Sequence, residues 1–265
     1  MKSSEQRSAQ ILELRGRDIS HIASPFPSLL ILKTKSYNFS LHFRHCIHYP
    51  DQLIKVSASE KLKMAETVFT PALQEIEHVK SENGEIMTKP FLEACKHILP
   101  VIDKFGAALI IVKSDIGGNI SRLESKYSSD PVKFNFLYSM VELEVETKTA
   151  KGSSSCTNGL LWLTRAMDFL LELFRDLIDH PDWSMSQCCN DSYSKTLKKW
   201  HGWFASSSVT VAMKLAPDRN KFMEVLGGAG NVKADIEKFL ATFSPILQEN
   251  HQFLASVGMD DLKAS

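Results

Sequence analysis

The middle of the chain contains a segment that is expected to form a helix in the interior of a protein. It begins at Thr157 or Asn158, after the Gly/Ser-rich residues 151–155, and His180-Pro181-Asp182 ends it. Its apolar residues recur at three- and four-residue spacing: Leu160, Leu161, Leu163, Met167, Leu170, Leu171, Phe174 and Leu177. Because this apolar face is too wide for one neighbouring helix to cover, the segment predicts a central helix within a helical domain.

Helical start and stop signals recur on both sides of this segment, from Val68 almost to the end of the chain. The helices that we expect span residues 90–102, 120–124, 131–145, 193–215, 221–226 and 232–253. Pro100 should kink or divide the first, and Asp130-Pro131 and Asp191-Ser192 are interpreted as caps. The sequence shows no internal repeat, alternating strand pattern or hairpin dipeptide, so an all-α fold is predicted.

Composition narrows the class of protein further. Acidic and basic residues cancel at 31 each, which argues against a nucleic-acid binder. No segment approaches the ~20 apolar residues that cross a bilayer. The five cysteines form neither a regular framework nor a CxxC pair, which favours a reducing compartment; they are Cys46, Cys95, Cys156, Cys188 and Cys189. We therefore expect a soluble, cytoplasmic protein that binds no nucleic acid and no metal.

The N-terminal part of the chain differs from the rest. Residues 1–63 combine a charged start, a proline-interrupted apolar patch and a stretch rich in His, Phe and Tyr. No helical or strand period persists through them. We expect a poorly ordered or weakly packed extension over residues 1–63 and one domain over residues 64–265.

Signatures of common enzyme classes are missing from the sequence. It contains no GxSxG, P-loop, HExxH or dinucleotide-binding glycine pattern. Gly117-Gly118 resembles a phosphate-binding turn, but Asp115 beside it would repel a phosphate. We expect no catalytic residues and no cofactor.

Three polar residues in an otherwise apolar region are candidates for ligand binding. Asp115, Asn119 and Arg122 follow i, i+4, i+7 spacing, which places them on one face of a helix. An acceptor, an amide and a cation together suit a ligand rich in hydroxyl groups. The spacing alone nevertheless favours a structural interpretation, in which Asp115 caps a helix, Asn119 lies in a turn and Arg122 faces solvent.

Aromatic residues in two other segments also have two interpretations. Trp162 lies among leucines, where an indole usually packs in a core but could stack on a sugar at a cavity mouth. His201 lies between aromatic residues and could be structural or could bind a ligand. Trp203 could anchor the protein in a membrane interface, with lysines one and two turns away.

The order of these segments resembles one known family. Residues 112–123 resemble the DxxxNxx[K/R] element of the glycolipid transfer protein family, residues 158–166 its GLLWLxR helix, and Trp200-His201-Gly202-Trp203 its aromatic-His-x-Trp element. The resemblance covers residues 64–265, and the sequences of the three motifs are most similar to those of plant members. Residues 1–63 have no counterpart in it.

This resemblance implies a two-layer bundle of about eight helices that encloses an apolar tunnel for ceramide chains. It implies that Asp115, Asn119 and Arg122 bind the headgroup sugar and that Trp162 stacks beneath it. Asp115 and His201 would also bind the amide N–H and the carbonyl of the ceramide. Animal members usually carry Lys where Arg122 stands, which leaves the sugar preference open.

The function implied by the resemblance is non-enzymatic transport of glycosphingolipids between membranes by a monomer. Trp203 would dock on the membrane surface. The branch of the family that carries ceramide-1-phosphate has Arg where Trp162 stands, so Trp162 favours a neutral sugar. The alternatives are a carrier of ceramide-1-phosphate, or a helical module that senses lipid without bulk transfer.

Overall fold

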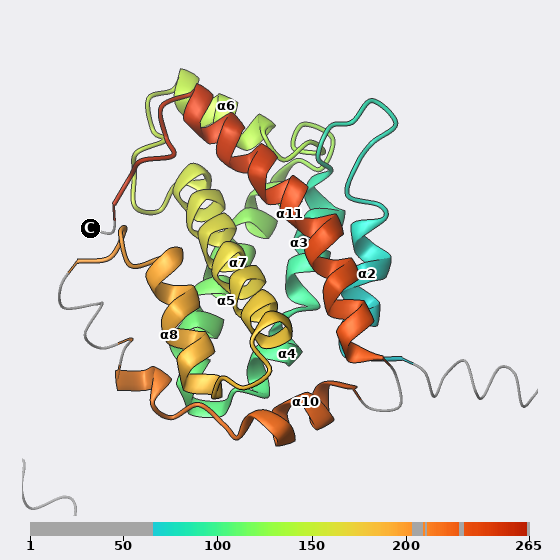
Figure 1. Cartoon of the computed structure of the whole chain (residues 1–265). Helices are drawn as coiled ribbons and strands as arrows, with labels where there is room; N and C mark the ends of the chain where they lie inside the picture. The colour runs from blue at the N-terminus through green and yellow to red at the C-terminus, as the bar shows by residue number, and fades with distance from the viewer. Residues whose placement is uncertain (1–65, 203–208, 210, 228–230, 264–265) are drawn as a thin grey trace, which may run out of the picture. The chain divides into compact units, whose positions relative to one another are not determined.

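The structure, a computed structural model, describes residues 66–202, 209, 211–227 and 231–263. Within these residues it contains nine α-helices and one 3-10 helix. The β-type contacts of this part are isolated bridges, Lys80 with Ile86 and Met87 with Phe136. The predicted all-α fold is confirmed (Figure 1). The predicted boundary between residues 63 and 64 lies outside the described residues.

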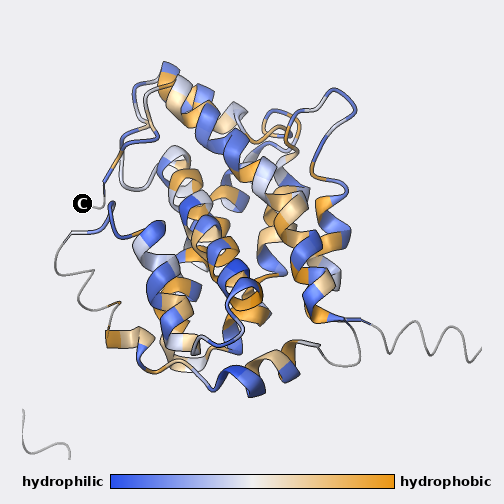
Figure 2. Cartoon of the chain, in the orientation of Figure 1, coloured by the Kyte–Doolittle hydropathy of each residue, from blue (hydrophilic) through white to orange (hydrophobic). Residues whose placement is uncertain are grey.

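Helix α7 (Cys156–Asp179) is the central helix that the sequence predicts (Figure 1). It packs against α5 (Ile110–Ser129), α6 (Ser139–Glu146), α8 (Met185–Lys195) and α11 (Val232–Ser256). Figure 2 shows hydrophobic and hydrophilic residues on different faces of the surrounding helices. Because α7 is covered from several sides, most of its wide apolar face is buried.

The N-terminus of α7 is fixed by side chains from its own end and from α6. Ser155 Oγ accepts the backbone N–H of Asn158, and the Glu144 carboxylate accepts the backbone N–H groups of Cys156 and Thr157, each at 2.8 Å. Three of the N–H groups that no helical carbonyl can reach are thereby satisfied. The helix therefore begins at Cys156, slightly earlier than its expected start at Thr157 or Asn158.

The remaining helices complete a bundle around a phenylalanine-rich core. The first predicted helix is divided near Pro100, as expected, into α3 (Thr88–Lys96) and α4 (Leu99–Asp103), and Pro100 lies in the first turn of α4. The helices α7, α11, α2 (Thr70–Ile76), α3 and α5 form a closed series in which each contacts the next. Buried rings in mutual contact run through it: Phe69, Phe91, Phe174, Phe239 and Phe243.

Helix α5 is longer than expected. It is continuous over 20 residues and includes Gly117-Gly118, whereas the sequence indicated a helix only from Ile120. Asp115 is therefore an interior residue of the helix, and its interpretation as an N-cap is wrong. A pair of glycines lowers helix propensity by ~2 kcal/mol in total, which packing of Ile116 and Ile120 in the core outweighs.

Helix α6 begins later than expected, at Ser139 instead of residue 131. Residues 131–138 form turns, a bend and the bridge at Phe136, because their backbone bonds to residues 86–88 at the start of α3. Thr88 donates its hydroxyl to the carbonyl of Phe134, and the Leu137 N–H donates to the carbonyl of Ile86. These long-range bonds replace the helical bonds that Asp130-Pro131 indicated.

The predicted helix over residues 193–215 is also wrong. Helix α8 begins after Ser184, which forms a capping box with Gln187, and it ends at Lys195. Ser192, which the sequence indicated as part of a cap, lies inside α8 and donates its hydroxyl to Asp176 at 2.8 Å. The last two predicted helices are confirmed as α10 (Arg219–Gly227) and α11.

Candidate functional site

A cavity of about 670 Å³ opens beside the central helix, a volume typical of small-molecule sites. Helices α5, α7 and α8 form its walls together with segments that follow α8 and α11. Its lining residues are Ile111, Val112, Asp115, Asn119, Arg122, Lys151, Ser153, Asn158, Trp162, Ala166, Phe169, Tyr193, Leu197, His201, Val209, Met213, Leu262 and Lys263. Five of the six residues that the sequence indicated as site residues are among them.

The three polar residues of α5 lie on one face of the helix and share this cavity, as their spacing predicts. Asn119 is only 4% exposed, and its side-chain Nδ2 has no hydrogen-bond partner among the described residues. A buried donor without a partner costs free energy, so a ligand acceptor at this position would be favoured.

Asp115 lies at the mouth of the cavity, where it remains accessible to solvent. The surrounding protein removes part of its water, which raises the pKa of its carboxyl, while Asn119 and the Arg122 cation partly oppose this rise. An ionised carboxylate here can only accept hydrogen bonds. It therefore complements a hydroxyl or an amide N–H and not a phosphate.

Arg122 connects α5 to the start of α7. Its Nη1 donates to the backbone carbonyls of Ser153 and Ser155 at 3.2 and 3.3 Å. A Cβ atom at Gly159 would lie 3.1 Å from Arg122 Cδ, so glycine at this position lets the arginine lie across the helix. Arg122 thus both borders the cavity and fixes the loop that brings Lys151 and Ser153 to it.

Trp162 and His201 both border the cavity, and their rings stack on each other. Their rings are nearly parallel, at 19°, with centroids 5.5 Å apart. His201 Nδ1 lies 3.1 Å from the Tyr193 hydroxyl. Burial and the nearby Arg165 cation lower the pKa of His201, so the imidazole is neutral at neutral pH. If Tyr193 donates to Nδ1, then Nε2 carries the proton and can donate to a ligand.

The cavity changes character along α7. Asn158 and Trp162 border it near the start of the helix, close to Arg122, and Ala166 and Phe169 border it one and two turns farther on. Apolar residues from other segments also border the cavity: Leu197, Val209, Met213 and Leu262. A ligand with a polar head and an apolar body fits this arrangement.

Arg165 is the residue of this region whose role the sequence did not reveal. It is 2% exposed, and it donates to the carbonyls of Leu262 and Asp260 at 2.6 and 2.5 Å. Its guanidinium lies 3.6 Å from the ring centroid of Trp200 and 5.0 Å from that of Trp162. Burial lowers its pKa to about 10, so it stays charged at neutral pH. The signal in the sequence that could have indicated this role is the presence of an arginine within the apolar face of α7.

Trp203, indicated as the membrane-docking residue, lies outside the described residues. Five polar residues of the cavity lining were not indicated by their sequence context: Lys151, Ser153, Asn158, Tyr193 and Lys263. They reach the cavity through contacts between segments that are distant in sequence. No described helix is both long and apolar enough to cross a membrane.

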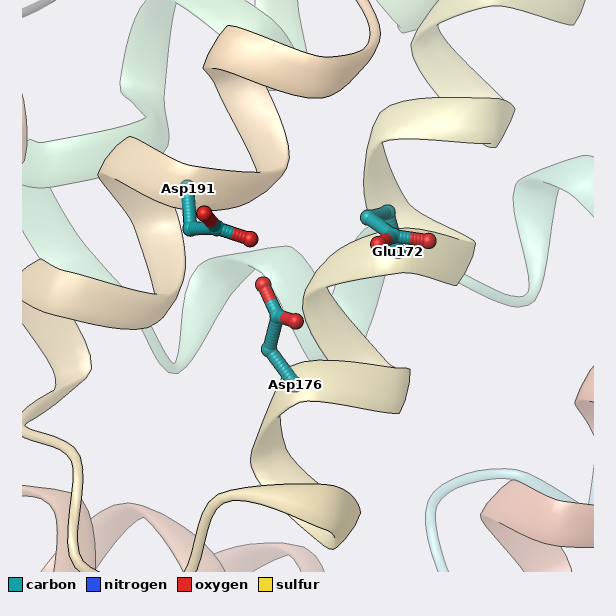
Figure 3. A group of neighbouring side chains, drawn as sticks. All are labelled: Glu172, Asp176 and Asp191. Atoms are coloured by element: carbon teal, nitrogen blue, oxygen red, sulfur yellow. The ribbon is translucent and has the colours of Figure 1, made fainter.

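A cluster of three carboxylates lies on the side of α7 that faces α8 (Figure 3). Glu172, Asp176 and Asp191 have oxygens close to one another, and the Lys195 ammonium lies 2.7, 3.5 and 2.6 Å from them, respectively. Asp176 is buried and also accepts the Ser192 hydroxyl. The cluster is an ion-pair network that joins α7 to α8.

Comparisons with known proteins agree with this geometry. A family model described as "Glycolipid transfer protein (GLTP)" matches residues 86–228. The chain is 69% identical over 202 residues to Glycolipid transfer protein 1 of Arabidopsis thaliana, which covers 76% of this chain and 100% of that protein. It is 31% identical to the Glycolipid transfer protein of Danio rerio, over 60% of this chain and 82% of that one.

Solved structures share the fold. The structure reported as "How FAPP2 Selects Simple Glycosphingolipids Using the GLTP-fold" has a TM-score of 0.69 and 26% identity, over 76% of this chain and 100% of that one. A mutant of Arabidopsis accelerated-cell-death 11, complexed with ceramide-1-phosphate, has a TM-score of 0.66 and 21% identity, over 74% of this chain and 99% of that one. At this lower identity the likeness concerns the fold alone.

Proposed function

The chain belongs to the glycolipid transfer protein family, and we propose that it carries glycosphingolipids, ceramides with a neutral sugar headgroup, from one membrane to another. The proposal rests on one cavity, which is bordered by the polar residues Asp115 and Asn119 of α5 and by Trp162 and an apolar wall of α7. Binding, orientation and release are sufficient for this function, so the proposal includes no covalent step and no catalytic residue.

The polar part of the cavity is assigned to the sugar. Asp115 accepts hydrogen bonds from sugar hydroxyls, Asn119 donates through its unpaired Nδ2, and Arg122 donates through the N–H groups that do not bind the loop. The Trp162 indole offers a flat apolar surface on which a sugar ring stacks. Together these groups supply selectivity, because an unmatched polar group in the site costs ~1–3 kcal/mol.

The amide group of the ceramide is assigned to the middle of the cavity. Asp115 accepts the amide N–H, and His201 donates from Nε2 to the amide carbonyl. This tautomer is compatible with the contact between His201 Nδ1 and the Tyr193 hydroxyl when the hydroxyl donates. The lowered pKa of His201 keeps the ring neutral, which suits an uncharged amide better than an imidazolium would.

The hydrocarbon chains are assigned to the apolar part of the cavity and to the core beyond it. Each CH₂ group that leaves a bilayer for water costs about 0.8 kcal/mol, so spontaneous escape of a ceramide is slow. A lining of Ala166, Phe169 and Met213 offers the chains an apolar environment instead. The protein thereby lowers the barrier without any change in the lipid.

Membrane contact is assigned to the surface near the cavity mouth. Ile110 and Ile111 at the start of α5 are 63% and 58% exposed, and Val211 and Leu215 are each 63% exposed. Exposed apolar side chains at the mouth would enter the lipid surface and let cargo pass without crossing water. We also propose that the carrier acts in the cytoplasm, because the cysteines of the described part are free thiols, as in a reducing compartment. That it acts as a monomer stays a prediction.

A ceramide-1-phosphate carrier on the same fold is the second candidate. Solved structures that share the fold include proteins in complex with ceramide-1-phosphate, and this likeness favours the second candidate. The Asp115 carboxylate weighs against it, because it would repel a phosphate at the mouth of the cavity. Trp162 also supplies no charge for a phosphate, so the neutral sugar is the better match.

Lipids that purify with the full-length protein test the proposal. The protein is expressed in cells that contain both glycosphingolipids and phosphorylated ceramides, and its bound lipids are identified by mass spectrometry. We expect ceramides with a neutral sugar to be enriched over their share in the membrane. Enrichment of ceramide phosphates or of glycerophospholipids instead would contradict the proposal.

A further inference from the structure

The end of the chain turns back against the cavity. Helix α11 ends at Ser256 and is followed by Gly258 at φ +70°. The N–H of Gly258 donates to the carbonyl of Ala255, and the N–H of Met259 donates to that of Leu254. This pair of bonds is the Schellman motif, in which a left-handed glycine reverses the chain after a helix. The reversal directs residues 259–263 to the cavity, where Leu262 and Lys263 form part of the lining.

Two side chains hold this segment in place. Arg165 of α7 binds its backbone at the carbonyls of Asp260 and Leu262. His251 of α11 binds its side chain, with Nδ1 2.6 Å from Asp260 Oδ1. The second ring nitrogen of His251, Nε2, lies 2.6 Å from Asp168 Oδ2 on α7.

The geometry at His251 requires a charged ring. Each of its two nitrogens faces a carboxylate oxygen, and a carboxylate can only accept hydrogen bonds. A neutral imidazole has one N–H and one lone pair, so it would direct the lone pair at one of the two carboxylates. Only the imidazolium satisfies both contacts at once.

We propose that residues 259–263 are a clasp on the lipid cavity and that the imidazolium of His251 holds the clasp against α7. The inference rests on the proposed function, since the clasp retains cargo only if the cavity carries a lipid. Loss of the proton from His251 leaves the ring one N–H for two carboxylates, so the contact with Asp260 or with Asp168 is lost. The link between the segment and α7 through His251 is then broken, while Arg165 and the packing of Met259 and Leu262 still hold the segment. Cargo should leave the cavity faster in that state.

Other charged groups near His251 do not provide the same switch. The neighbouring cavity between α7, α8 and α11 also contains Arg165, Glu172, Arg175, Lys195 and Lys199. Arg175 is paired with Glu172, and Lys195 with the carboxylate cluster of Figure 3. Arginine, lysine and carboxylate side chains ordinarily titrate far from neutral pH, whereas a histidine titrates close to it.

The direction of the pH effect follows from the contacts. Asp168 and Asp260 raise the pKa of His251, with burial acting against them. The clasp is therefore fully held at pH below the ordinary histidine value and is weakened as pH rises through the raised pKa. The pKa of His201 is lowered, so between pH 6.5 and 8.5 that ring stays neutral and does not obscure the effect.

The test measures release of a fluorescent glucosylceramide from the loaded full-length protein into excess phosphatidylcholine vesicles, between pH 6.5 and 8.5. We expect the release rate of the unmodified protein to rise about two- to five-fold over this range, as for a partly exposed ion pair. His251→Gln should be fast and independent of pH. His97→Gln is the matched control, because His97 borders neither cavity, and it should keep the normal profile.

Asp260→Asn provides a second variant, which removes the partner of His251 from the clasp and should also release quickly at every pH. A flat profile for the unmodified protein would overturn the clasp, even if His251→Gln failed to fold. Equal behaviour of His97→Gln and His251→Gln would overturn it as well. If no glucosylceramide binds at any pH, the proposed function itself fails, and the two failures are thus distinguishable.

Discussion

Asp115 contributes a carboxylate to the cavity, and its value for recognition is that it accepts hydrogen bonds and cannot donate them. Asp115 lies in the interior of α5, so its side chain is not needed to cap the helix. Asn119 and Arg122 follow on the same face. Ligand binding and stability therefore depend on different residues of α5, and substitutions can test that separation.

Replacement of Asp115 by Val should abolish glycolipid binding and change stability little. Valine fills a similar volume but removes the acceptor, and its lower helix propensity costs only ~0.5 kcal/mol or less. Melting temperature and vesicle-to-vesicle transfer are measured on the same variant, with the exposed Asp182→Val as control. A destabilised Asp115→Val protein that still transfers glycolipid would contradict the headgroup assignment and weaken the roles given to Asn119 and Arg122.

Replacement of Trp162 by Ala should abolish glycolipid transfer while the helical content is kept. The indole is only partly buried, and its neighbours are His201 and Arg165, so its loss leaves the main core intact. Circular dichroism reports the fold, and a transfer assay reports the function. A variant that unfolds, or one that transfers at the parent rate, would show that Trp162 is an ordinary packing residue.

The polar face of α5 could be predicted from sequence because helical geometry fixes which residues share a face. Whether Asp115 caps the helix or lies within it could not, because Ser-Asp before two glycines is typical of a helix start. The role of Arg165 depends on carbonyls 95 and 97 residues away. No local sequence pattern indicates a contact between residues that are so far apart along the chain.

At the scale of helices, long periodic segments with clear ends were predictable, and segments held by distant partners were not. Helices α7, α10 and α11 match their predicted ranges closely. The start of α6 depends on bonds from residues 134–137 to residues 86–88, and α8 depends on the capping box of Ser184. In neither case does the helix begin at the cap that the sequence indicated, Asp130-Pro131 for α6 and Asp191-Ser192 for α8.

The start of α7 is the element-level feature with the clearest energetic consequence. Glu144 of α6 accepts the N–H groups of Cys156 and Thr157 and also the Thr157 hydroxyl at 2.7 Å. Glu144→Ala should lower the free energy of unfolding by about 1–3 kcal/mol, because it leaves these donors unpaired and removes a negative charge from a helix N-terminus.

Denaturant unfolding measures this loss, with Glu142→Ala as the control. Glu142 belongs to the same helix but is exposed. A loss of stability for Glu144→Ala no greater than that for Glu142→Ala would show that the contact between α6 and α7 contributes little. The cavity wall formed by Asn158 and Trp162 depends on this start, so weaker glycolipid binding should accompany the loss.

At the scale of the whole molecule, the carrier should not require its first 63 residues. Their sequence has no sustained amphipathic period, and the family model matches from residue 86 onward. A protein that starts at Met64 should transfer glycolipid at nearly the rate of the full chain. Loss of solubility or of transfer would show that the extension packs on the helical domain.

The central claim is that the protein moves glycolipid between membranes and selects it through a polar site that suits a neutral sugar headgroup. The most direct test gives the full-length protein donor vesicles that contain equal amounts of labelled glucosylceramide and labelled ceramide-1-phosphate, and follows both labels into acceptor vesicles. We expect rapid transfer of glucosylceramide and at least a ~10-fold slower transfer of ceramide-1-phosphate. This ratio corresponds to a cost of ~1.4 kcal/mol or more for an unmatched polar group in the site. Equal transfer of both lipids, or preferential transfer of ceramide-1-phosphate, would contradict it.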